Sequence, residues 1–242
     1  VFFWGDYEPY ATKILARLVR PGDVAIDVGA NVGAFTAAMA RAVGPDGRVV
    51  SFEPYPPARK RLERTIALNG LSNVEVSAEA VADAVAPVVL VDYGPGFESW
   101  STLAPREIEM AKGTKVAPIG RTVVACTTLD QALVARGIDR VAVLKIDVEG
   151  AEGRVVAGAR ELLAAGRVEV LLLEVSDNTL EADGTSARVL LRSLAELNLA
   201  VHELEGAALR PFRPVGRVDR LVHAVALTEA GARRLSSSPG AG

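Results

Sequence analysis

Residues 22–36 of this chain read GDVAIDVGANVGAFT. The apolar run from Val24 to Val28 ends in a glycine-rich turn, and a helix-forming segment begins directly after it. A strand, turn and helix in this order are typical of α/β proteins that hold an adenosine-containing cofactor at the carboxyl edge of the first strand. We therefore expect a cofactor at this turn.

The kind of cofactor is indicated by the turn and by the next strand. Residues 49–54 read VVSFEP, and a carboxylate at Glu53 can accept two hydrogen bonds from a ribose. The turn has two glycines, Gly29 and Gly33, whereas a dinucleotide site has the spacing G-x-G-x-x-G. Asp27 would repel a pyrophosphate but suits the ammonium group of S-adenosylmethionine. These features favour S-adenosylmethionine over a dinucleotide, and over a tight turn that binds no ligand.

The composition argues against several other classes of protein. The chain has 242 residues and a formal net charge of −3, so it lacks the basic character of a nucleic-acid-binding protein. Its single cysteine, Cys126, excludes an internal disulfide and a cysteine-based metal cluster. No apolar stretch approaches the length of a membrane span, and no signal-like sequence opens the chain. We expect a cytoplasmic protein without a nucleic-acid partner.

Short apolar strands alternate with helical segments along the chain. Near-continuous apolar strands in such an alternation indicate an α/β fold, a mostly parallel sheet with helices on both faces. Residues 80–82 and 88–93 are expected to form a strand pair. The other expected strands are 24–28, 48–52, 73–77, 122–126, 141–146, 168–173, 201–205 and 221–227, and the expected helices are 34–43, 57–69, 129–136, 151–165 and 186–197.

The helix and strand periodicity is lost in one long stretch around Phe97 and Trp100, where Gly, Pro, Ser and Lys accumulate. We interpret this stretch as an insertion over the acceptor site, in which the two aromatic side chains either cover the site or anchor the loop to the core. The expected parts are a single domain (1–235) with an N-terminal segment (1–22) and the insertion (94–121), followed by a disordered tail (236–242).

Acidic side chains follow several of the expected strands. Because the carboxyl ends of parallel strands meet at one edge of a sheet, these carboxylates should gather at the ligand crevice. The acids in question are Asp27, Glu53, Asp147 and Glu174.

Residues 145–152 form a second motif, KIDVEGAE. Lys145 shares one side of its strand with Asp147 and Glu149. A lysine in an apolar strand requires a charged partner, which these carboxylates supply. The motif thus predicts an acidic group at the cofactor edge rather than only a salt-bridged strand end.

Three motifs together resemble the FkbM family of S-adenosylmethionine-dependent methyltransferases. They are DVGANVG at residues 27–33, FEP at 52–54 and KIDVEGAE at 145–152, and the resemblance runs from about Asp6 to Leu227. It implies a class I, Rossmann-like methyltransferase fold with a seven-stranded sheet whose last strand is antiparallel. It also implies methyl transfer to a hydroxyl oxygen of a sugar, polyketide or other specialised metabolite, with S-adenosylhomocysteine as product.

The resemblance also assigns roles to residues of this sequence. The turn from Gly29 to Gly33 would line the methionine part, Glu53 would bind the ribose, and Asp147 would lie near the methyl donor. The adenine would lie near Pro54 and near Glu79, Ala80 and Val81, and Tyr7 with Glu8 could close over the site. The expected cofactor-binding residues are Tyr7, Asp27, Gly29, Ala30, Asn31, Gly33, Thr36, Glu53, Pro54, Ala80 and Asp147.

The sulfonium of S-adenosylmethionine already carries a good leaving group, so the enzyme mainly aligns the reacting atoms. A weakly nucleophilic hydroxyl benefits from a general base. Asp147, Glu149 and Glu174 are the expected catalytic residues, since His202 and His223 fit ordinary strand positions better. A magnesium ion shared by Asp147 and Glu174 is a second version of the mechanism.

Other functions remain open at this point. The same site could methylate the nitrogen of an amino sugar or similar amine. A non-catalytic cofactor-binding protein is a further alternative from a different class, whereas a nucleotide-dependent oxidoreductase is disfavoured by Asp27 and by the absent third glycine. The expected partner is a small-molecule acceptor, and a homodimer is one expectation for the oligomeric state.

Overall fold

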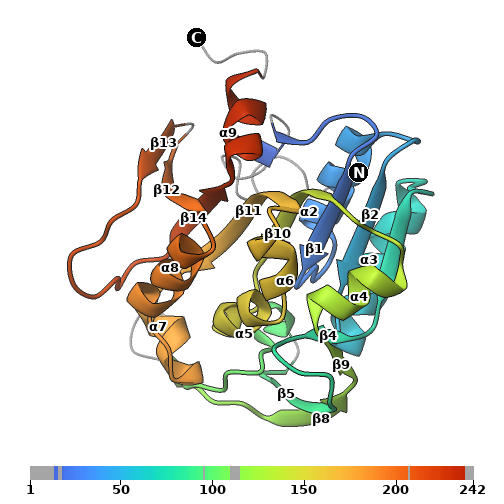
Figure 1. Cartoon of the computed structure of the whole chain (residues 1–242). Coiled ribbons are helices and arrows are strands. Elements are labelled where there is room, and N and C mark those ends of the chain that lie inside the picture. Colours follow the sequence, from blue (N-terminus) through green and yellow to red (C-terminus); the bar gives the residue numbers. More distant parts are fainter. Residues whose placement is uncertain (1–13, 16–17, 95, 110–114, 207, 238–242) are drawn as a thin grey trace.

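The fold is described here from a computed structural model of the chain (Figure 1). The structure describes residues 14–15, 18–94, 96–109, 115–206 and 208–237. The expected positions of Tyr7, Glu8 and most of the N-terminal segment lie outside these residues, as do positions 238–242 of the expected tail.

A central sheet organises the described part of the chain. Its strand order is β13-β12-β14-β11-β10-β1-β2-β3, and the five strands from β11 to β3 are parallel. β14 runs antiparallel to both of its neighbours, β11 and β12. The strands are β1 (Val24–Val28), β2 (Arg48–Phe52), β3 (Val74–Ser77), β10 (Val141–Ile146), β11 (Val168–Val175), β12 (Ala200–Glu205), β13 (Ala208–Pro211) and β14 (Val222–Leu227).

The sheet has one strand more than the seven expected. β13 pairs antiparallel with β12, so that the two strands form a hairpin at one edge of the sheet. The segment of β13, with Arg210 and Pro211, lacks the apolar alternation that predicts a strand. Its strand conformation therefore depends on pairing with β12 rather than on its own sequence pattern.

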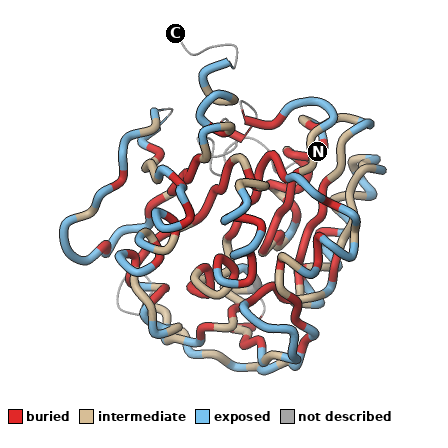
Figure 2. Tube along the Cα trace, in the orientation of Figure 1, coloured by how far each residue is buried: buried red, intermediate tan, exposed pale blue. Residues whose placement is uncertain are grey.

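Two layers of helices cover the sheet (Figure 1). One apolar cluster joins β1, β10 and β11 to α4, α5, α6 and α8, and a second joins the other sheet face to α2. The central strands are buried along nearly their whole length (Figure 2). The helices are α2 (Ala34–Val43), α3 (Pro56–Leu68), α4 (Leu129–Ala135), α5 (Glu152–Ala157), α6 (Arg160–Ala164), α7 (Asp177–Leu180), α8 (Ala187–Glu196) and α9 (Glu229–Ser236).

The helix expected over residues 151–165 is divided into α5 and α6 at Gly158. A side chain at Gly158 would place its Cβ 1.9 Å from the carbonyl oxygen of Ala82, so the chain passes very close to the neighbouring segment here. The carbonyl of Gly158 also accepts a hydrogen bond from the backbone N–H of Asp130. Tertiary contacts of this kind end the helix where its sequence periodicity continues.

The expected pairing of residues 80–82 with 88–93 is wrong. β4 (Ala80–Val81) pairs with β9 (Cys126–Thr127), and β5 (Val88–Asp92) pairs with β8 (Gly120–Val124). The partners of both strands lie beyond the insertion, and short apolar runs carry no information about such distant pairing. The insertion therefore projects from the β5–β8 hairpin, with a short helix η1 (Glu98–Trp100) and the strands β6 (Ile108–Glu109) and β7 (Lys115–Val116).

Candidate active site

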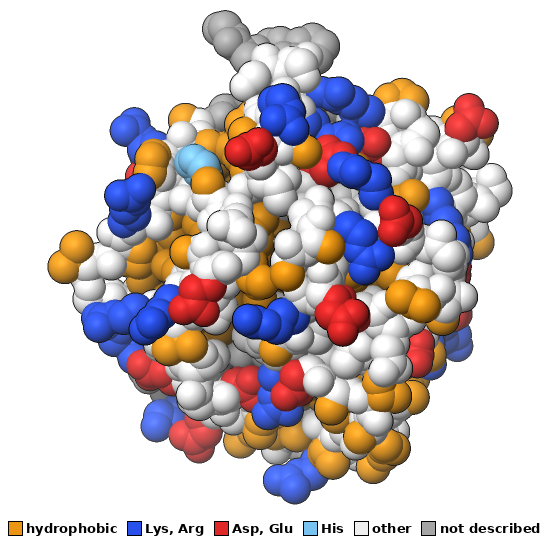
Figure 3. Space-filling model, viewed as in Figure 1, with side chains coloured by type: hydrophobic (Ala, Val, Ile, Leu, Met, Phe, Trp, Pro, Cys, Tyr) orange, Lys and Arg blue, Asp and Glu red, His pale blue; other side chains and the backbone are white. Residues whose placement is uncertain are grey.

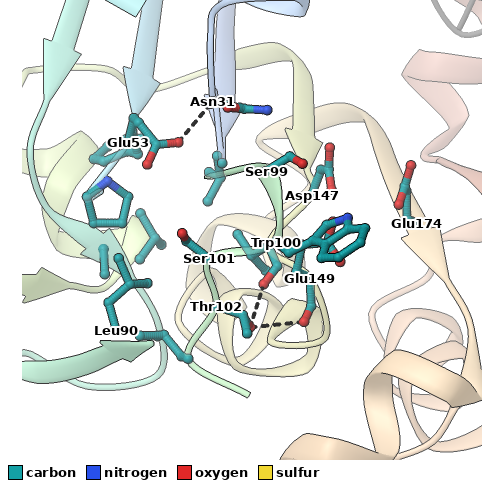
Figure 4. A pocket seen from close by; sticks show the side chains of 18 of the residues that line it. Asn31, Glu53, Leu90, Ser99, Trp100, Ser101, Thr102, Asp147, Glu149 and Glu174 are labelled. Carbon is teal, nitrogen blue, oxygen red and sulfur yellow. Dashed lines mark hydrogen bonds between the residues drawn. The ribbon is translucent and has the colours of Figure 1, made fainter. Parts of the chain in front are cut away.

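A cavity of about 250 Å³ lies at the carboxyl ends of the parallel strands (Figure 4). Its walls come from the β1 turn, the end of β2, the β4 and β5 region, the insertion, the loop after β10, and the end of β11. The lining residues are Val28, Gly29, Asn31, Phe52, Glu53, Pro54, Glu79, Ala80, Val81, Leu90, Ser99, Trp100, Ser101, Thr102, Leu103, Asp147, Val148, Glu149, Glu174 and Leu221.

Glu53 connects the turn after β1 with the end of β2. Its Oε2 accepts a hydrogen bond from the backbone N–H of Asn31 at 2.7 Å, and its Oε1 accepts one from the backbone N–H of Tyr55 at 2.8 Å. Burial raises the pKa of Glu53 to about 7, although these two hydrogen bonds oppose the shift. Each carboxylate oxygen keeps a second lone pair, so Glu53 can still accept two hydroxyl donors.

Two polar atoms around the cavity have no hydrogen-bond partner among the described residues. Asn31 Oδ1 and Ser101 Oγ are both buried, and both residues line the cavity. Buried polar groups in native proteins are nearly always hydrogen-bonded, so an unpaired pair at one cavity suggests that a ligand completes the site. A nucleoside with a methionine tail carries donors and acceptors along its whole length and fits this requirement.

The two glycines of the turn are required by the backbone itself. Gly29 has φ +78°, and a Cβ there would lie 1.8 Å from the carbonyl oxygen of Asp147. Gly33 has φ +88°, and its Cβ would lie 2.6 Å from Leu62 Cδ1. Of the two, only Gly29 lines the cavity. These glycines therefore let the turn approach the loop after β10 and helix α3 closely.

Asp27 lies behind the cavity wall and is fully buried. Its Oδ2 accepts a hydrogen bond from Thr36 Oγ1 at 2.6 Å, and its Oδ1 lies 3.4 Å from Lys145 Nζ. The alternation of strand side chains explains this position, because Val28 faces the cavity and its neighbour Asp27 faces α2. Neither Asp27 nor Thr36 lines the cavity, so the structure places both in the network that supports the site.

Lys145 joins this buried network to the cavity wall. Its ammonium donates to Asp147 Oδ2 at 3.0 Å and to the carbonyl oxygen of Gly29 at 3.3 Å. Burial alone would lower the pKa of Lys145, but the carboxylates of Asp147 and Asp27 raise it well above its usual value. The lysine is therefore charged and holds Asp147 against the turn.

The loop after β10 is tied to the insertion through Glu149. This residue has φ +58°, an uncommon conformation for a side chain other than glycine. Its carbonyl accepts hydrogen bonds from Thr102 Oγ1 at 2.9 Å and Arg106 Nη1 at 2.8 Å, and its carboxylate pairs with Arg106 at 3.0 Å. Burial and the charge of Asp147 raise the pKa of Glu149, and Arg106 opposes this shift.

Glu174 and Trp100 lie at the end of the cavity that is far from Glu53 (Figure 4). Glu174 of β11 is paired in register with His223 of β14, and His223 Nδ1 lies 3.6 Å from Glu174 Oε1. The ring of Trp100 stacks on Phe97, with ring centroids 4.8 Å apart, and meets Tyr93 edge-on at 6.3 Å. Phe97 therefore anchors Trp100, while Trp100 itself faces the cavity.

The structure brings eight of the expected site residues to one cavity and leaves four out. Those that line it are Gly29, Asn31, Glu53, Pro54, Ala80, Asp147, Glu149 and Glu174, whereas Asp27, Ala30, Gly33 and Thr36 do not. Tyr7 lies outside the described residues. The sequence analysis assigns no site role to seven further lining residues. Three of them lie within its motifs at 27–33, 52–54 and 145–152, and two follow Trp100 by two and three positions, so these five had a signal in the sequence. The seven residues are Val28, Phe52, Leu90, Thr102, Leu103, Val148 and Leu221.

A strand order of this kind, with a nucleoside-sized cavity at the carboxyl edge and a ribose-type acid after β2, defines the class I methyltransferases that use S-adenosylmethionine. The model of the methyltransferase FkbM domain matches residues 27–201. The chain therefore belongs to the FkbM methyltransferase family, a family of S-adenosylmethionine-dependent methyltransferases.

Curated relatives and solved structures agree with this assignment. The methyltransferase sdnD of Sordaria araneosa is 31% identical over 157 residues, which cover 56% of this chain and 60% of sdnD. The AMB antimetabolite synthetase AmbE of Pseudomonas aeruginosa is 29% identical over 214 residues, with 74% of this chain and 10% of AmbE covered. The chain thus spans less than two thirds of either relative.

Among solved structures, a methyltransferase FkbM from Methylobacillus flagellatus has a TM-score of 0.52 at 14% identity, with 89% of this chain and 50% of that chain covered. At this identity the match supports the fold alone. It confirms the expected class I methyltransferase fold, and the additional strand β13 lies at the sheet edge, away from the cavity walls.

The residues expected to share a magnesium ion fit that role poorly. Asp147 and Glu174 both line the cavity, but Oδ2 of Asp147 is already bound to the ammonium of Lys145 at 3.0 Å, so this oxygen is not available as a ligand to a metal ion. Within the described ranges, no group of three or more His, Cys, Asp or Glu side chains is placed to hold a metal ion.

No described helix has the length and hydrophobicity needed to span a bilayer.

Proposed function

We propose that this protein transfers a methyl group from S-adenosylmethionine to a hydroxyl oxygen of a small molecule. The main observation that supports this proposal is that one cavity contains Glu53 at one end and Glu174 at the other, with Asp147 between them (Figure 4). This arrangement supports a cofactor that lies along the cavity and an acceptor that meets it near Glu174.

The chain's own residues would hold the cofactor by complementary chemistry. Glu53 would accept hydrogen bonds from the ribose hydroxyls, and Asp147 would pair with the ammonium of the methionine part. Leu90 and Leu103 would contact the adenine, and Ser101 would gain a partner for its buried hydroxyl. When bound, S-adenosylmethionine supplies an electrophilic methyl group on a sulfonium, whose sulfur keeps the bonding electron pair when the methyl group leaves.

The three expected catalytic carboxylates have different surroundings, which suggest different roles. Asp147 is held by Lys145, and Glu149 is held by Arg106 in the tether to the insertion. Glu174 lies at the end of the cavity away from Glu53, where the acceptor would meet the cofactor, and its Oε1 is 3.6 Å from His223 Nδ1. We therefore assign Glu174 as the general base that removes the hydroxyl proton while the oxygen forms its bond to the methyl carbon.

The relative AmbE supports a specialised metabolite as the acceptor, because it is called an antimetabolite synthetase. On the face that Figure 3 shows, positive and negative side chains are interspersed rather than gathered into a basic patch. This distribution, with a net charge of −3, favours a small molecule over nucleic acid. The cytoplasmic location and the homodimer remain predictions.

The base assignment is tested with Glu174→Gln, a nearly isosteric change. We expect S-adenosylhomocysteine to bind with unchanged affinity while kcat falls by about 100-fold, the usual contribution of a general base. Glu63→Gln is the matched control, since Glu63 is exposed on α3 and does not line the cavity. Full activity of Glu174→Gln would exclude Glu174 as the base. The methyltransferase activity of the wild-type protein should also persist when a chelator is added. Loss of activity with the chelator would instead support a mechanism in which Asp147 and Glu174 share a magnesium ion.

A further inference from the structure

The cavity wall carries charge of one sign. Its described lining residues include no Lys, Arg or His, although they include several acids. Coulomb repulsion in a partly desolvated cavity is strong enough to disfavour an anionic ligand. The acids of the lining are Glu53, Glu79, Asp147, Glu149 and Glu174.

Two cations form ion pairs with acids of the lining from behind the wall. Lys145 is 5% exposed and contacts Asp147 from the protein side, and Arg106 contacts Glu149 in the same manner. Neither cation lines the cavity. A ligand in the cavity therefore contacts the carboxylates and not the two cations. The cations fix the orientation of those carboxylates from behind.

An aromatic ring lines the same cavity as these carboxylates. Figure 4 shows the indole of Trp100 at the end of the cavity away from Glu53, the end at which Glu174 also lies, and Asp147 and Glu149 line the same cavity. The stacking of Phe97 holds the indole in place. The face of an indole attracts ammonium groups, so the ring and the carboxylates favour the same kind of ligand.

We propose that the acceptor is a basic alcohol, a molecule whose protonated amine is recognised by Trp100 and the surrounding carboxylates. This inference rests on the proposed function and names its substrate class. Acceptors that carry phosphate or carboxylate near the reacting hydroxyl are excluded by repulsion. The carboxylates also keep the amine protonated and without a lone pair, so the hydroxyl rather than the amine takes the methyl group.

The first test uses two cofactor analogues and calorimetry. Sinefungin has a protonated amine where S-adenosylmethionine has its methyl sulfonium, and S-adenosylhomocysteine has neither charge. We expect sinefungin to bind at least about tenfold more tightly than S-adenosylhomocysteine, because its amine would lie beside the carboxylates of the cavity. Trp100→Leu should reduce this preference, Trp100→Phe should retain most of it, and Glu63→Gln should leave it unchanged.

Equal affinity of the wild-type protein for the two analogues would overturn the inference and leave the proposed function standing. An unchanged preference in a folded Trp100→Leu variant, with folding checked by circular dichroism, would remove Trp100 from the subsite. Failure of the wild-type protein to bind S-adenosylhomocysteine at all would instead overturn the proposed function. The two failures are therefore distinguishable.

The second test compares three matched acceptors in the complex with S-adenosylhomocysteine. Methyl glycosides that differ only in an amino, a hydroxyl or a carboxylate group are examined by saturation-transfer NMR. We expect the amino glycoside to bind, the neutral one to bind more weakly, and the carboxylate to show no binding. Binding of the carboxylate as strong as that of the amine, or no binding of the amine, would overturn the inference.

Discussion

At the scale of single residues, Glu53 combines two properties that oppose each other. Two backbone N–H groups bind its carboxylate, yet burial raises its pKa to about 7. Binding to ribose hydroxyls requires the ionised carboxylate, which accepts hydrogen bonds on both oxygens. In the proposed binding mode, protonation of this one side chain therefore competes with cofactor binding near neutral pH.

We expect the affinity for S-adenosylhomocysteine to rise as the pH increases from 6 to 8. With a pKa of about 7, the ionised fraction of Glu53 increases about tenfold over this range, so the dissociation constant should fall by about tenfold. Glu53→Gln should bind more weakly and lose this pH dependence. Calorimetry at several pH values measures both effects.

The control for this experiment is Glu63→Gln, in which an exposed carboxylate of α3 is removed. It should keep the pH dependence of the wild-type protein. A pH dependence that survives in Glu53→Gln would show that another group, such as Glu149 with its raised pKa, controls binding.

At the scale of structural elements, the turn between β1 and α2 positions the site. Gly29 brings the turn against the loop after β10, where the backbone N–H of Asp147 also donates to the carbonyl of Val28. The carbonyl of Phe52 accepts hydrogen bonds from the N–H groups of Gly29 and Ala30. Three parallel strands therefore end at one point, and their side chains meet there.

The close approach at Gly29 is tested with Gly29→Ala against Gly22→Ala. Both glycines have positive φ, but a Cβ at Gly22 meets nothing within 4 Å, whereas a Cβ at Gly29 would overlap the carbonyl of Asp147. We expect Gly22→Ala to lose about 1 kcal/mol of unfolding free energy, from backbone strain alone. Gly29→Ala should lose about 3 kcal/mol or more and bind S-adenosylhomocysteine weakly.

Urea denaturation of both variants measures these losses. Equal losses in the two variants would show that the turn can move away from the loop after β10 at little cost. In that case the contact with Asp147 would not be a requirement of the fold.

At the scale of the whole molecule, one buried polar network connects the two central strands with α2 and β2. Lys145 of β10 contacts Asp27 of β1, Thr36 of α2 donates to Asp27, and the hydroxyls of Thr36 and Ser51 of β2 lie 2.9 Å apart. All of these side chains are buried. Asp27 Oδ1 has no hydrogen bond among the described residues, so the charge of this carboxylate depends on the ion pair with Lys145, and the network is vulnerable to loss of that one member.

We expect Lys145→Met to lower the free energy of unfolding by about 3–5 kcal/mol, because the buried carboxylate of Asp27 then lacks its counter-charge. The double variant Lys145→Met with Asp27→Asn should recover part of this loss. Lys115→Met, at an exposed position, should change stability by less than about 0.5 kcal/mol. Denaturation curves of the three variants provide the measurement, and a stable Lys145→Met variant would contradict the role of the network.

Much of the core could be predicted because its signals are local. The β1 strand is predicted by five consecutive residues, and the acid after β2 by its place at a strand end. The pairing of β4 and β5 could not be predicted, because their partners follow the insertion in the sequence. The strand β13 was missed for a related reason, since only its neighbour β12 stabilises it.

The sequence by itself determined the alternation of strands and helices, the glycine turn after β1 and the acids at the sheet edge, since each depends on residues close together in the chain. Only the tertiary structure decided that Asp27 faces Lys145 instead of the cavity, and that Thr102 and Arg106 of the insertion reach the loop after β10. The physical reason is that the direction of a side chain and its distant neighbours follow from the packing of whole elements, which no local pattern encodes.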